Sequence, residues 1–346
     1  MEHPTLSSDW QDEVRQQIDS WLKHFFEHKH ASGQAYALKN KVLIDAIEDL
    51  TLRGGKRLRP LLLYATALAV DSKIKIEPLI KAGAALELLQ SYFLIHDDWM
   101  DQDELRRGDK SVHTMFEARG HDPHQASSLA ILAGDLCSSY AWDAMLQACK
   151  DHAEPAAVLA AFSDMQQQVI LGQYLDVVAH DDIDLIYQLK TGSYTSSGPV
   201  LLGALLAGAK KETQDQLLKF AQPLGMAFQL RDDLLGCFGH SETTGKGIGT
   251  DLIRQKRTAV LQLAEAKLSA DGKALFERLH QDAALSDELL QALLVYLKET
   301  GVAEIVENKI EALQSDSLGH LNQAGLRQDG KNTLKELALQ FIARAH

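Results

Sequence analysis

Apolar residues recur every three or four positions along most of the chain, with polar residues between them. In residues 10–30, for example, Val14, Ile18 and Phe25 fall on one side of a helix. The pattern predicts helices over residues 10–30, 36–52, 127–149, 154–176, 184–192, 199–209, 213–238, 258–270, 275–281, 286–300, 301–313 and 333–344. Two further helices are expected to begin at Arg59 and Glu77, each followed by a proline, and the second to end near Gly108.

No alternating strand pattern and no linker rich in glycine, serine or proline interrupts this series. Of the 346 residues, 45% are hydrophobic, which is enough for a sizeable buried core. We therefore expect an all-α bundle in which residues 1–346 form one domain. A helical repeat array is the structural alternative, although the chain shows no fixed repeat period.

Composition narrows the class of protein. A net charge of -13 argues against a general nucleic-acid-binding surface, while a local basic pocket stays possible. Cys137, Cys149 and Cys237 are scattered and form no CxxC pair, which argues against a disulfide framework or a zinc site and suits a reducing cytoplasm. Residues 1–4 do not resemble a signal peptide, and the most apolar segment, residues 199–209, is too short to span a bilayer. We expect a soluble, cytoplasmic protein without an integral membrane segment.

The highest density of charged residues lies in residues 94–108, which carry five acids and two arginines directly after an apolar run. On a helix, Asp97 and Asp101 stand one turn apart on the same face, where like charges repel each other. A cation between them would relieve that repulsion. Ligands that are all oxygen favour Mg²⁺ over Zn²⁺, and Mg²⁺ commonly completes its shell with water and substrate phosphate. The segment therefore predicts a magnesium site for a phosphorylated substrate.

A second acidic group lies on the helix predicted for residues 213–238. Gln229 precedes Asp232 by three residues and Asp233 by four, so all three can face one cavity. Acidic pairs on two helices of a bundle can hold ions between them. A single pair of aspartates, by contrast, is usually solvated surface.

Basic residues accompany both acidic groups and suit phosphate binding. Their positions are Lys56, Arg57 and Arg59 after a Gly-Gly turn, Arg106 and Arg107, Lys190, Lys246, and Lys256 and Arg257. A helix that begins beside the Gly-Gly turn would add backbone N–H donors for an anion. The simpler interpretation, cations that balance acids on a wet surface, suits Arg53 and Lys211 better than this turn.

Five motifs occur in a fixed order between residues 50 and 260. They are Gly54-Gly55-Lys56-Arg57-Leu58-Arg59-Pro60, Asp97-Asp98-Trp99-Met100-Asp101 with Arg106-Arg107-Gly108, Gly172-Gln173-Tyr174-Leu175-Asp176, Lys190-Thr191, and Phe228-Gln229 with Asp232-Asp233. The set resembles the trans-isoprenyl diphosphate synthases, also called polyprenyl synthetases. That resemblance implies the all-α isoprenoid synthase fold around a deep central cavity, and usually a homodimer. It also implies head-to-tail (1'-4) condensation of isopentenyl diphosphate with an allylic diphosphate.

The resemblance further implies a role for each matching residue. The ligands of three Mg²⁺ ions would be Asp97, Asp101 and Asp232. The residues that contact the allylic diphosphate would be Arg106, Lys190 and Lys246. The residues that hold isopentenyl diphosphate would be Lys56, Arg59, Gln90 and Arg107. Beside the developing carbocation would lie Thr191 and Gln229, while Gln173, Asp176 and Lys256 would support the wall and mouth of the site.

Product length is predicted from the residues four and five positions before the first aspartate, which set the depth of the hydrocarbon cavity in this family. Here they are Phe93 and Tyr92. Two aromatic side chains should block the cavity early, which favours farnesyl diphosphate, with geranylgeranyl diphosphate as the alternative. If both rings are ordinary core residues, they carry no such information.

Three other classes of protein would differ from this family in the residues they need. A class I terpene cyclase would lack the Gly-Gly-Lys-Arg and Arg-Arg-Gly elements that accommodate a second diphosphate. A metal phosphohydrolase built on His96 and Asp97 would need further histidine ligands, and His113, His121 and His124 are expected in a loop. A non-enzymatic helical scaffold would need none of these residues. Gly236 stands where many relatives carry a third aspartate, a departure that leaves the metal role with Asp232.

Overall fold

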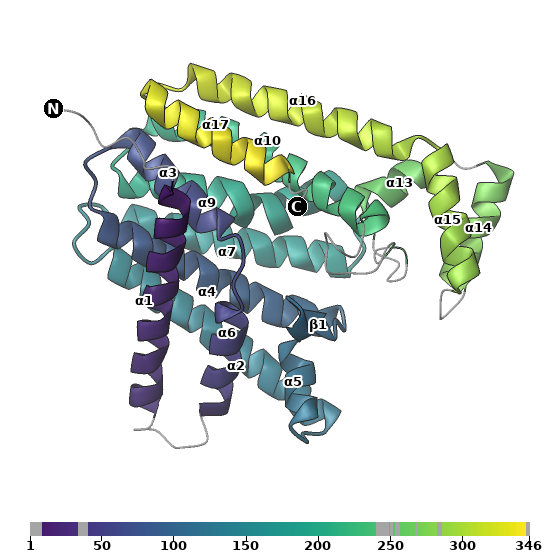
Figure 1. Cartoon of the computed structure of the whole chain (residues 1–346), viewed down its shortest axis with the longest axis horizontal. Coiled ribbons are helices and arrows are strands. Elements are labelled where there is room, and N and C mark those ends of the chain that lie inside the picture. The colour runs from purple at the N-terminus through teal and green to yellow at the C-terminus, as the bar shows by residue number, and fades with distance from the viewer. Residues whose placement is uncertain are drawn as a thin grey trace. The chain divides into compact units, whose positions relative to one another are not determined.

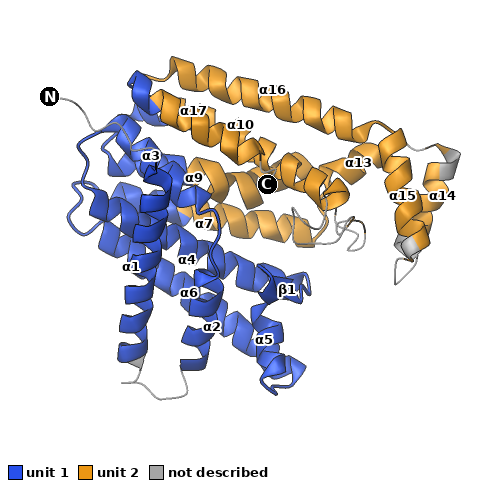
Figure 2. Cartoon of the chain, viewed as in Figure 1, with its two compact units in different colours: residues 1–163, 199–214, 326–330 blue, residues 164–198, 215–325, 331–346 orange. Residues whose placement is uncertain are grey.

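The computed structural model describes residues 9–33, 41–239, 249, 252, 257–267, 269–281 and 286–343. Helices make up nearly all of the regular structure within these ranges, which confirms the predicted all-α class (Figure 1). The chain divides into two compact units, residues 1–163, 199–214 and 326–330 in the first and the remainder in the second (Figure 2). Each unit is described by itself below, and the single-domain organisation stays a prediction.

The first unit is organised around a long, apolar central helix. Its elements are α1 (Trp10–Gly33), α2 (Lys41–Leu52), α3 (Leu58–Val70), α4 (Ile76–Met100), β1 (Leu105–Arg106), β2 (Asp109–Lys110), α5 (Val112–Ala118), α6 (Pro123–Ala148), the first part of α7 (Pro155–Val177) and most of α9 (Gly198–Leu206). Helix α4 packs most extensively against α6. On α6 the buried positions repeat at three and four residues and are mostly small: Ala126, Ala130, Ala133, Cys137, Ala141 and Ala144. Small side chains let the two helix backbones approach closely, which fixes α4 in place.

The second unit holds the remaining helices. They are the rest of α7, α8 (Ile183–Ile186), the π-helix η2 (Tyr187–Ser197), α10 (Lys211–Phe238) from residue 215, α13 (Ala259–Glu265), α14 (Ala270–Gln281), α15 (Asp287–Glu299), α16 (Val302–Gln323) and α17 (Gln328–Ala343) from residue 331. Hydroxyl side chains cap two of these helices, because Thr258 Oγ1 accepts from Leu261 N and Ser286 Oγ accepts from Leu289 N. Such caps satisfy backbone donors that a helix start leaves unpaired.

The π-helix is pressed between two glycines of neighbouring helices. A Cβ at Gly172 on α7 would lie 2.7 Å from Lys190 Cα and closer still to Lys190 N, so only glycine fits there. A Cβ at Gly225 on α10 would lie 2.7 Å from Gly192 Cα. The π-helix is the rarest helical form and is often found at functional sites. Here it carries Lys190 and Thr191, two residues predicted to act on substrate.

Several predicted boundaries were wrong. Helix α4 ends at Met100 rather than near Gly108, because residues 105–110 turn back as a two-stranded hairpin with Arg107 and Gly108 at positive φ. The separate helices expected over 184–192 and 199–209 form one continuous helical run from Ile183 to Leu206, in which Pro199 occupies the first turn of α9, where proline is tolerated. Helix α5 was missed, and the helix expected over 301–313 extends to Gln323.

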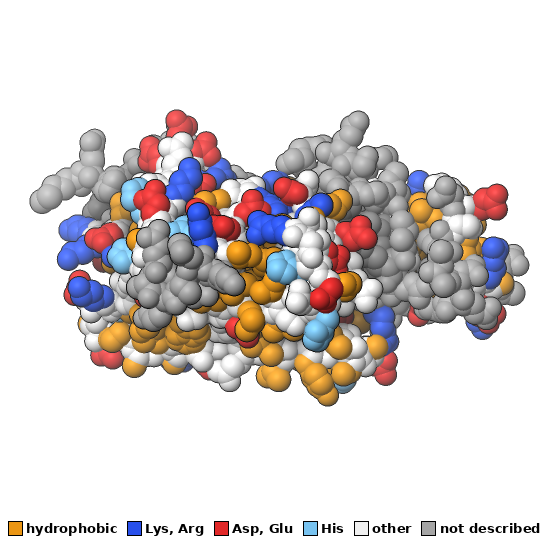
Figure 3. Space-filling model, turned by 90° about the horizontal axis from the view of Figure 1, so that it is seen from below, with side chains coloured by type: hydrophobic (Ala, Val, Ile, Leu, Met, Phe, Trp, Pro, Cys, Tyr) orange, Lys and Arg blue, Asp and Glu red, His pale blue; other side chains and the backbone are white. Residues whose placement is uncertain are grey.

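The described surface carries charges of both signs. Described side chains of both signs stand close together on the face shown in Figure 3, where they form no broad basic area. Within the described ranges, no helix combines the length and the apolar character that a membrane crossing requires.

Candidate active site

The last turn of α4 carries the first acidic cluster. Asp97 lies one turn before Asp101, and the Asp101 backbone N–H donates to the Asp97 carbonyl oxygen at 2.8 Å. The predicted one-turn spacing is therefore present, although Asp101 is the C-cap of the helix rather than an interior residue. Both side chains are half-buried. Carboxylate oxygens as the donor set fit Mg²⁺ better than a softer metal.

Asp98, between these two, has a different role. It is only 1% exposed and binds Arg106, whose Nε donates to Oδ1 at 2.7 Å. Burial raises the pKa of the Asp98 carboxyl to about 6, against the opposing effect of Arg106. Its Oδ2 atom has no hydrogen-bond partner among the described residues. Arg106 also donates to Asp103 Oδ2 at 3.2 Å, so this predicted diphosphate ligand is held by two carboxylates.

The turn of the hairpin brings Arg107 to the Gly-Gly turn that precedes α3. A Cβ at Gly55 would lie 3.7 Å from Arg107 Nη2, at van der Waals distance, so the guanidinium lies directly beside the turn. Burial lowers the pKa of Arg107, Glu87 opposes that effect, and the positive charges of neighbouring arginines, Arg106 among them, lower it further. Two motifs separated by about fifty residues therefore form one cationic cluster, which a bound anion would stabilise.

The other basic residues near this cluster have separate roles. Arg57 adopts a left-handed backbone conformation and turns its side chain inward, where it forms ion pairs with buried Glu87 and, at 2.8 Å, with Asp19. Burial opposes its charge, but the two carboxylates raise the pKa of Arg57 overall. Lys56 is exposed and Arg59 is buried in the first turn of α3. Arg57 thus anchors the turn, and the predicted ligands Lys56 and Arg59 flank that anchor.

In the second unit, the predicted residues of α7, the π-helix and α10 meet through side chains. Lys190 Nζ lies 2.6 Å from Asp176 Oδ2. Thr191 Oγ1 donates to Gln229 Oε1 at 2.7 Å, and Gln229 Nε2 donates to Asp233 Oδ1 at 2.9 Å. Thr191 and Gln229, which are 38 residues apart in the sequence, therefore contact each other directly.

The second acidic pair divides into an inner and an outer carboxylate. Asp233 is 2% exposed and accepts from Tyr187 Oη, while Ala259 N donates to that hydroxyl at 2.8 Å and to Asp233 Oδ2 at 3.2 Å. Asp232 is exposed. Asp233 is therefore held in the interior by Tyr187, Gln229 and the start of α13, and the expectation that Asp232, Asp233 and Gln229 all face one cavity stays a prediction.

The two aromatic residues predicted to set product length lie on α4. The rings of Tyr92 and Phe93 are 4.9 Å apart, and Tyr92 also packs edge-on against His96 at 5.0 Å. His96 fills space that Gly134 on α6 leaves open, with its Nε2 3.1 Å from the Ile131 carbonyl oxygen. Tyr92 therefore leans toward α6.

Some predicted residues lie elsewhere. Lys246 and Lys256 fall outside the described residues. Gln90 and Gln173 are half-buried on α4 and α7.

Two groups of residues contain histidines that could act as metal ligands. The expected loop at His113 and His124 was wrong, since these residues belong to α5 and α6. A separate cluster, His30 with Asp45 and Glu48, is accounted for by a pair between His30 Nε2 and Glu48 Oε2 at 2.7 Å.

Comparison with known proteins decides the family. Residues 40–297 match the family described as polyprenyl synthetase. The chain belongs to the polyprenyl synthetase family. This polyprenyl synthetase is therefore a prenyltransferase, as predicted, of a family that depends on magnesium. Its membership removes the support for a phosphohydrolase, a terpene cyclase or a non-enzymatic scaffold.

Relatives agree with this assignment. The polyprenyl synthetase is 31% identical over 292 residues to a short chain isoprenyl diphosphate synthase of Methanocaldococcus jannaschii, covering 82% of each chain. It is 32% identical over 278 residues to a farnesyl diphosphate synthase of Haemophilus influenzae, covering 75% of this chain and 88% of the relative. A crystal structure of geranylgeranyl pyrophosphate synthase from Corynebacterium glutamicum, complexed with isoprenyl diphosphate and magnesium, is similar at a TM-score of 0.89 and 31% identity, covering 96% and 99% of the two chains. The predicted isoprenoid synthase fold is confirmed.

Two residues, one in each unit, hold predicted site residues in place but were not predicted from the sequence. Tyr187 gave no signal, because a lone tyrosine in a helix is ordinary. Arg53 was assigned to the solvated surface, yet its side chain is only 9% exposed and contacts the hairpin. A basic residue directly before a Gly-Gly turn was the available signal.

Proposed function

We propose that this enzyme condenses isopentenyl diphosphate with an allylic diphosphate, head to tail, and releases a short-chain product. The observation that carries the proposal is the cationic cluster of Arg107 against the Gly54-Gly55 turn, close to the acidic end of α4 in sequence and within the same unit. A condensing enzyme needs room for two diphosphates. Acidic residues suit the one held through metal, and arginines and lysines suit the other.

Asp97 and Asp101 have the oxygen donors that Mg²⁺ requires, and Asp232 is the exposed carboxylate of the second pair. We assign three Mg²⁺ ions to these residues. Bound magnesium would neutralise the diphosphate as it leaves. Arg106 and Lys190, with Lys246, would contact the same leaving group. Their charge stabilises the pyrophosphate as the allylic C–O bond breaks.

The second substrate would bind through Lys56, Arg59, Gln90 and Arg107. Its double bond attacks the allylic cation, and the adduct then loses a proton, for which the departed pyrophosphate is a suitable base. Thr191 and Gln229 would place oxygen dipoles beside the cation. Their mutual hydrogen bond supports this role because it fixes both side chains before substrate arrives.

Farnesyl diphosphate is the product we favour over geranylgeranyl diphosphate. The adjoining rings of Tyr92 and Phe93, 4.9 Å apart and tilted by 43°, support this choice, because two aromatic side chains about one turn before Asp97 would block the path of a growing hydrocarbon. Replacing both by alanine should lengthen the product by at least one five-carbon unit. An unchanged product distribution in the double variant would overturn the assignment.

We also propose that the enzyme is a homodimer. Leu132 and Leu146 on α6 are each 53% exposed. Large apolar side chains at the surface of a helix suit a face that another subunit covers. Light scattering coupled to gel filtration should give twice the mass of one chain.

The reaction is tested by incubating the enzyme with Mg²⁺, isopentenyl diphosphate and, in separate reactions, dimethylallyl, geranyl or farnesyl diphosphate. Chromatography of the dephosphorylated products gives chain length directly. The proposal expects a fifteen-carbon alcohol from the first two primers and none longer. A twenty-carbon alcohol would identify the alternative product, and pyrophosphate release without condensation would refute the reaction.

A further inference from the structure

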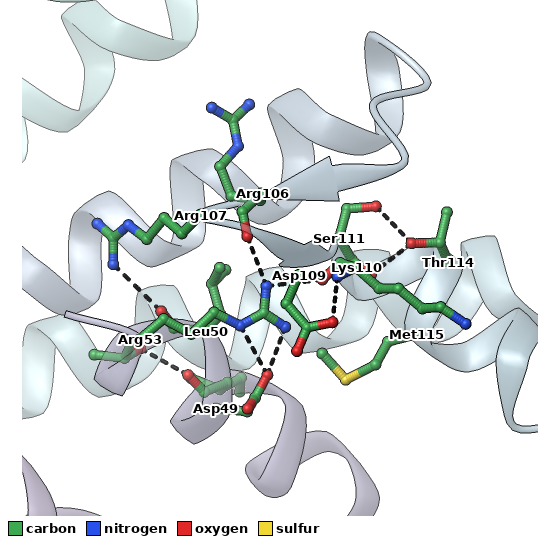
Figure 4. A network of polar contacts seen from close by, with 12 residues as sticks. Asp49, Leu50, Arg53, Arg106, Arg107, Asp109, Lys110, Ser111, Thr114 and Met115 are labelled. Atoms are coloured by element: carbon green, nitrogen blue, oxygen red, sulfur yellow. Dashed lines mark hydrogen bonds and ion pairs between the residues drawn. The ribbon is translucent and has the colours of Figure 1, made fainter. Parts of the chain in front are cut away.

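Arg53 joins the C-terminal end of α2 to the hairpin that carries Arg106 and Arg107. Its Nη1 donates to the Arg106 carbonyl oxygen at 2.9 Å and to the Lys110 carbonyl oxygen at 2.8 Å. These two carbonyls belong to different strands, so a single guanidinium nitrogen bridges β1 and β2 (Figure 4).

The guanidinium itself is held in place from the other side. Its Nε and Nη2 both donate to Asp49 Oδ2, at 3.0 and 2.6 Å, one helical turn back on α2. The side chain of Arg53 is 9% exposed, whereas that of Asp49 is 48% exposed. This planar, doubly anchored fork has the geometry in which arginine cannot be replaced by lysine without loss.

The hairpin needs such support. Each strand is two residues long, and a two-stranded ladder of that length is not stable by itself in water. At its turn, Arg107 adopts φ 54°, a left-handed conformation that is unfavourable for a residue other than glycine. Hydrogen bonds from outside the hairpin must therefore compensate for its short ladder and for the left-handed backbone of Arg107.

Arg106 and Arg107 differ in how else they are held. The Arg106 side chain binds Asp98 and Asp103, so it keeps two anchors if the hairpin shifts. The Arg107 side chain donates to the Leu50 carbonyl oxygen at 3.3 Å, which is a long hydrogen bond. Leu50 lies in the last turn of α2, which directly precedes Arg53. The position of Arg107 therefore depends more on Arg53 than that of Arg106 does.

We propose that Arg53 is a positioning residue, which clamps the hairpin so that Arg107 meets isopentenyl diphosphate in a fixed orientation. This inference rests on the proposed function. Displacing a binding group by about 1 Å can cost on the order of a hundredfold in rate. Because Arg107 is the more dependent of the two arginines, loss of the clamp should weaken the isopentenyl diphosphate site selectively.

The test compares Arg53→Lys with Arg327→Lys. Arg327 also binds a carboxylate through two nitrogens, Nε to Asp329 Oδ1 at 3.2 Å and Nη2 to Asp329 Oδ2 at 2.9 Å, but it does not contact the hairpin. We expect Arg53→Lys to raise KM for isopentenyl diphosphate roughly tenfold, with KM for the allylic substrate within twofold of wild type. Arg327→Lys should leave both constants unchanged.

Hydrogen–deuterium exchange of the peptide covering residues 104–111 gives a readout that does not depend on activity. Faster exchange in Arg53→Lys, but not in Arg327→Lys, is expected. Unchanged exchange, an equal rise in both KM values, or lower thermal stability with unchanged KM would each overturn the positioning role. If the wild-type enzyme fails to condense the substrates, the proposed function falls, and the exchange measurement still decides whether Arg53 clamps the hairpin.

Discussion

Removing Arg57 should destabilise the first unit far more than removing an ordinary surface arginine. Glu87, its partner on α4, is 2% exposed, so Arg57→Met would leave a buried carboxylate without its ion pair. Breaking a buried pair from one side typically costs about 3–5 kcal/mol. With an unfolding entropy of about 2.1 cal/mol/K per residue, or roughly 0.7 kcal/mol/K for the whole chain, this corresponds to a fall of about 5 °C in Tm.

The same arginine provides its own control. Asp19, its other partner, is 40% exposed and can be solvated by water once it loses a contact. Asp19→Asn should therefore cost less than about 1 kcal/mol. The double variant Arg57→Met, Glu87→Met removes both buried charges together, and should recover most of the loss because no unpaired charge remains.

Differential scanning calorimetry and urea denaturation of the four proteins measure these values. The reasoning is refuted if Arg57→Met lowers Tm by less than about 1 °C, or if the double variant is as unstable as Arg57→Met alone. Either result would mean that Glu87 is solvated or finds another partner when Arg57 is removed.

Three further outcomes are expected. Gly172→Ala should lower kcat and Tm together, because the added Cβ overlaps the Lys190 backbone. Overpacking of this kind costs about 1–3 kcal/mol of stability. Steady-state kinetics and thermal melts would measure the two effects. Tyr187→Phe removes a donor to buried Asp233 and should shift the urea midpoint by the equivalent of about 1.5–3 kcal/mol. Burial raises the pKa of the Cys149 thiol to about 11, so Ellman's reagent at pH 8 should modify the native enzyme far more slowly than the urea-unfolded chain, whose three cysteines all react.

The sequence was informative wherever a pattern is local. Three- and four-residue spacing located the long helices, since burial on one face repeats with the turn of the helix. The pairing of Asp97 with Asp101 followed from the same geometry, and it is present although the helix ends at Met100. The resemblance to the family assigned Thr191 and Gln229 to the same part of the site, because each lies in a motif with that role. Their hydrogen bond depends on tertiary packing and could not be read from the motifs.

The sequence did not predict hydrogen-bond partners, burial or helix type where these depend on tertiary contacts. Arg106 binds Asp98 rather than Asp97 because of how α4 packs against the hairpin. The motif alone does not distinguish these two adjacent aspartates. The π-helix could not be foreseen, because its hydrogen bonding arises where α7 and α10 press on residues 187–197 through Gly172 and Gly225. Arg53 looked like surface for the same reason, as the carbonyls it binds come from residues more than fifty positions away.

The π-helix also constrains how this segment can change in length. A π-helix closes its hydrogen bonds over one more residue than an α-helix. Deleting one residue between Tyr187 and Ser197 could restore α-helical bonding without moving the flanking helices apart. The flanking helices would then keep their register, because the residue removed is the extra one of the π-helix, and only side chains within residues 187–197 would change direction. Lys190 would turn away from Asp176 while the chain remained well folded, so a one-residue gap here would separate folding from catalysis.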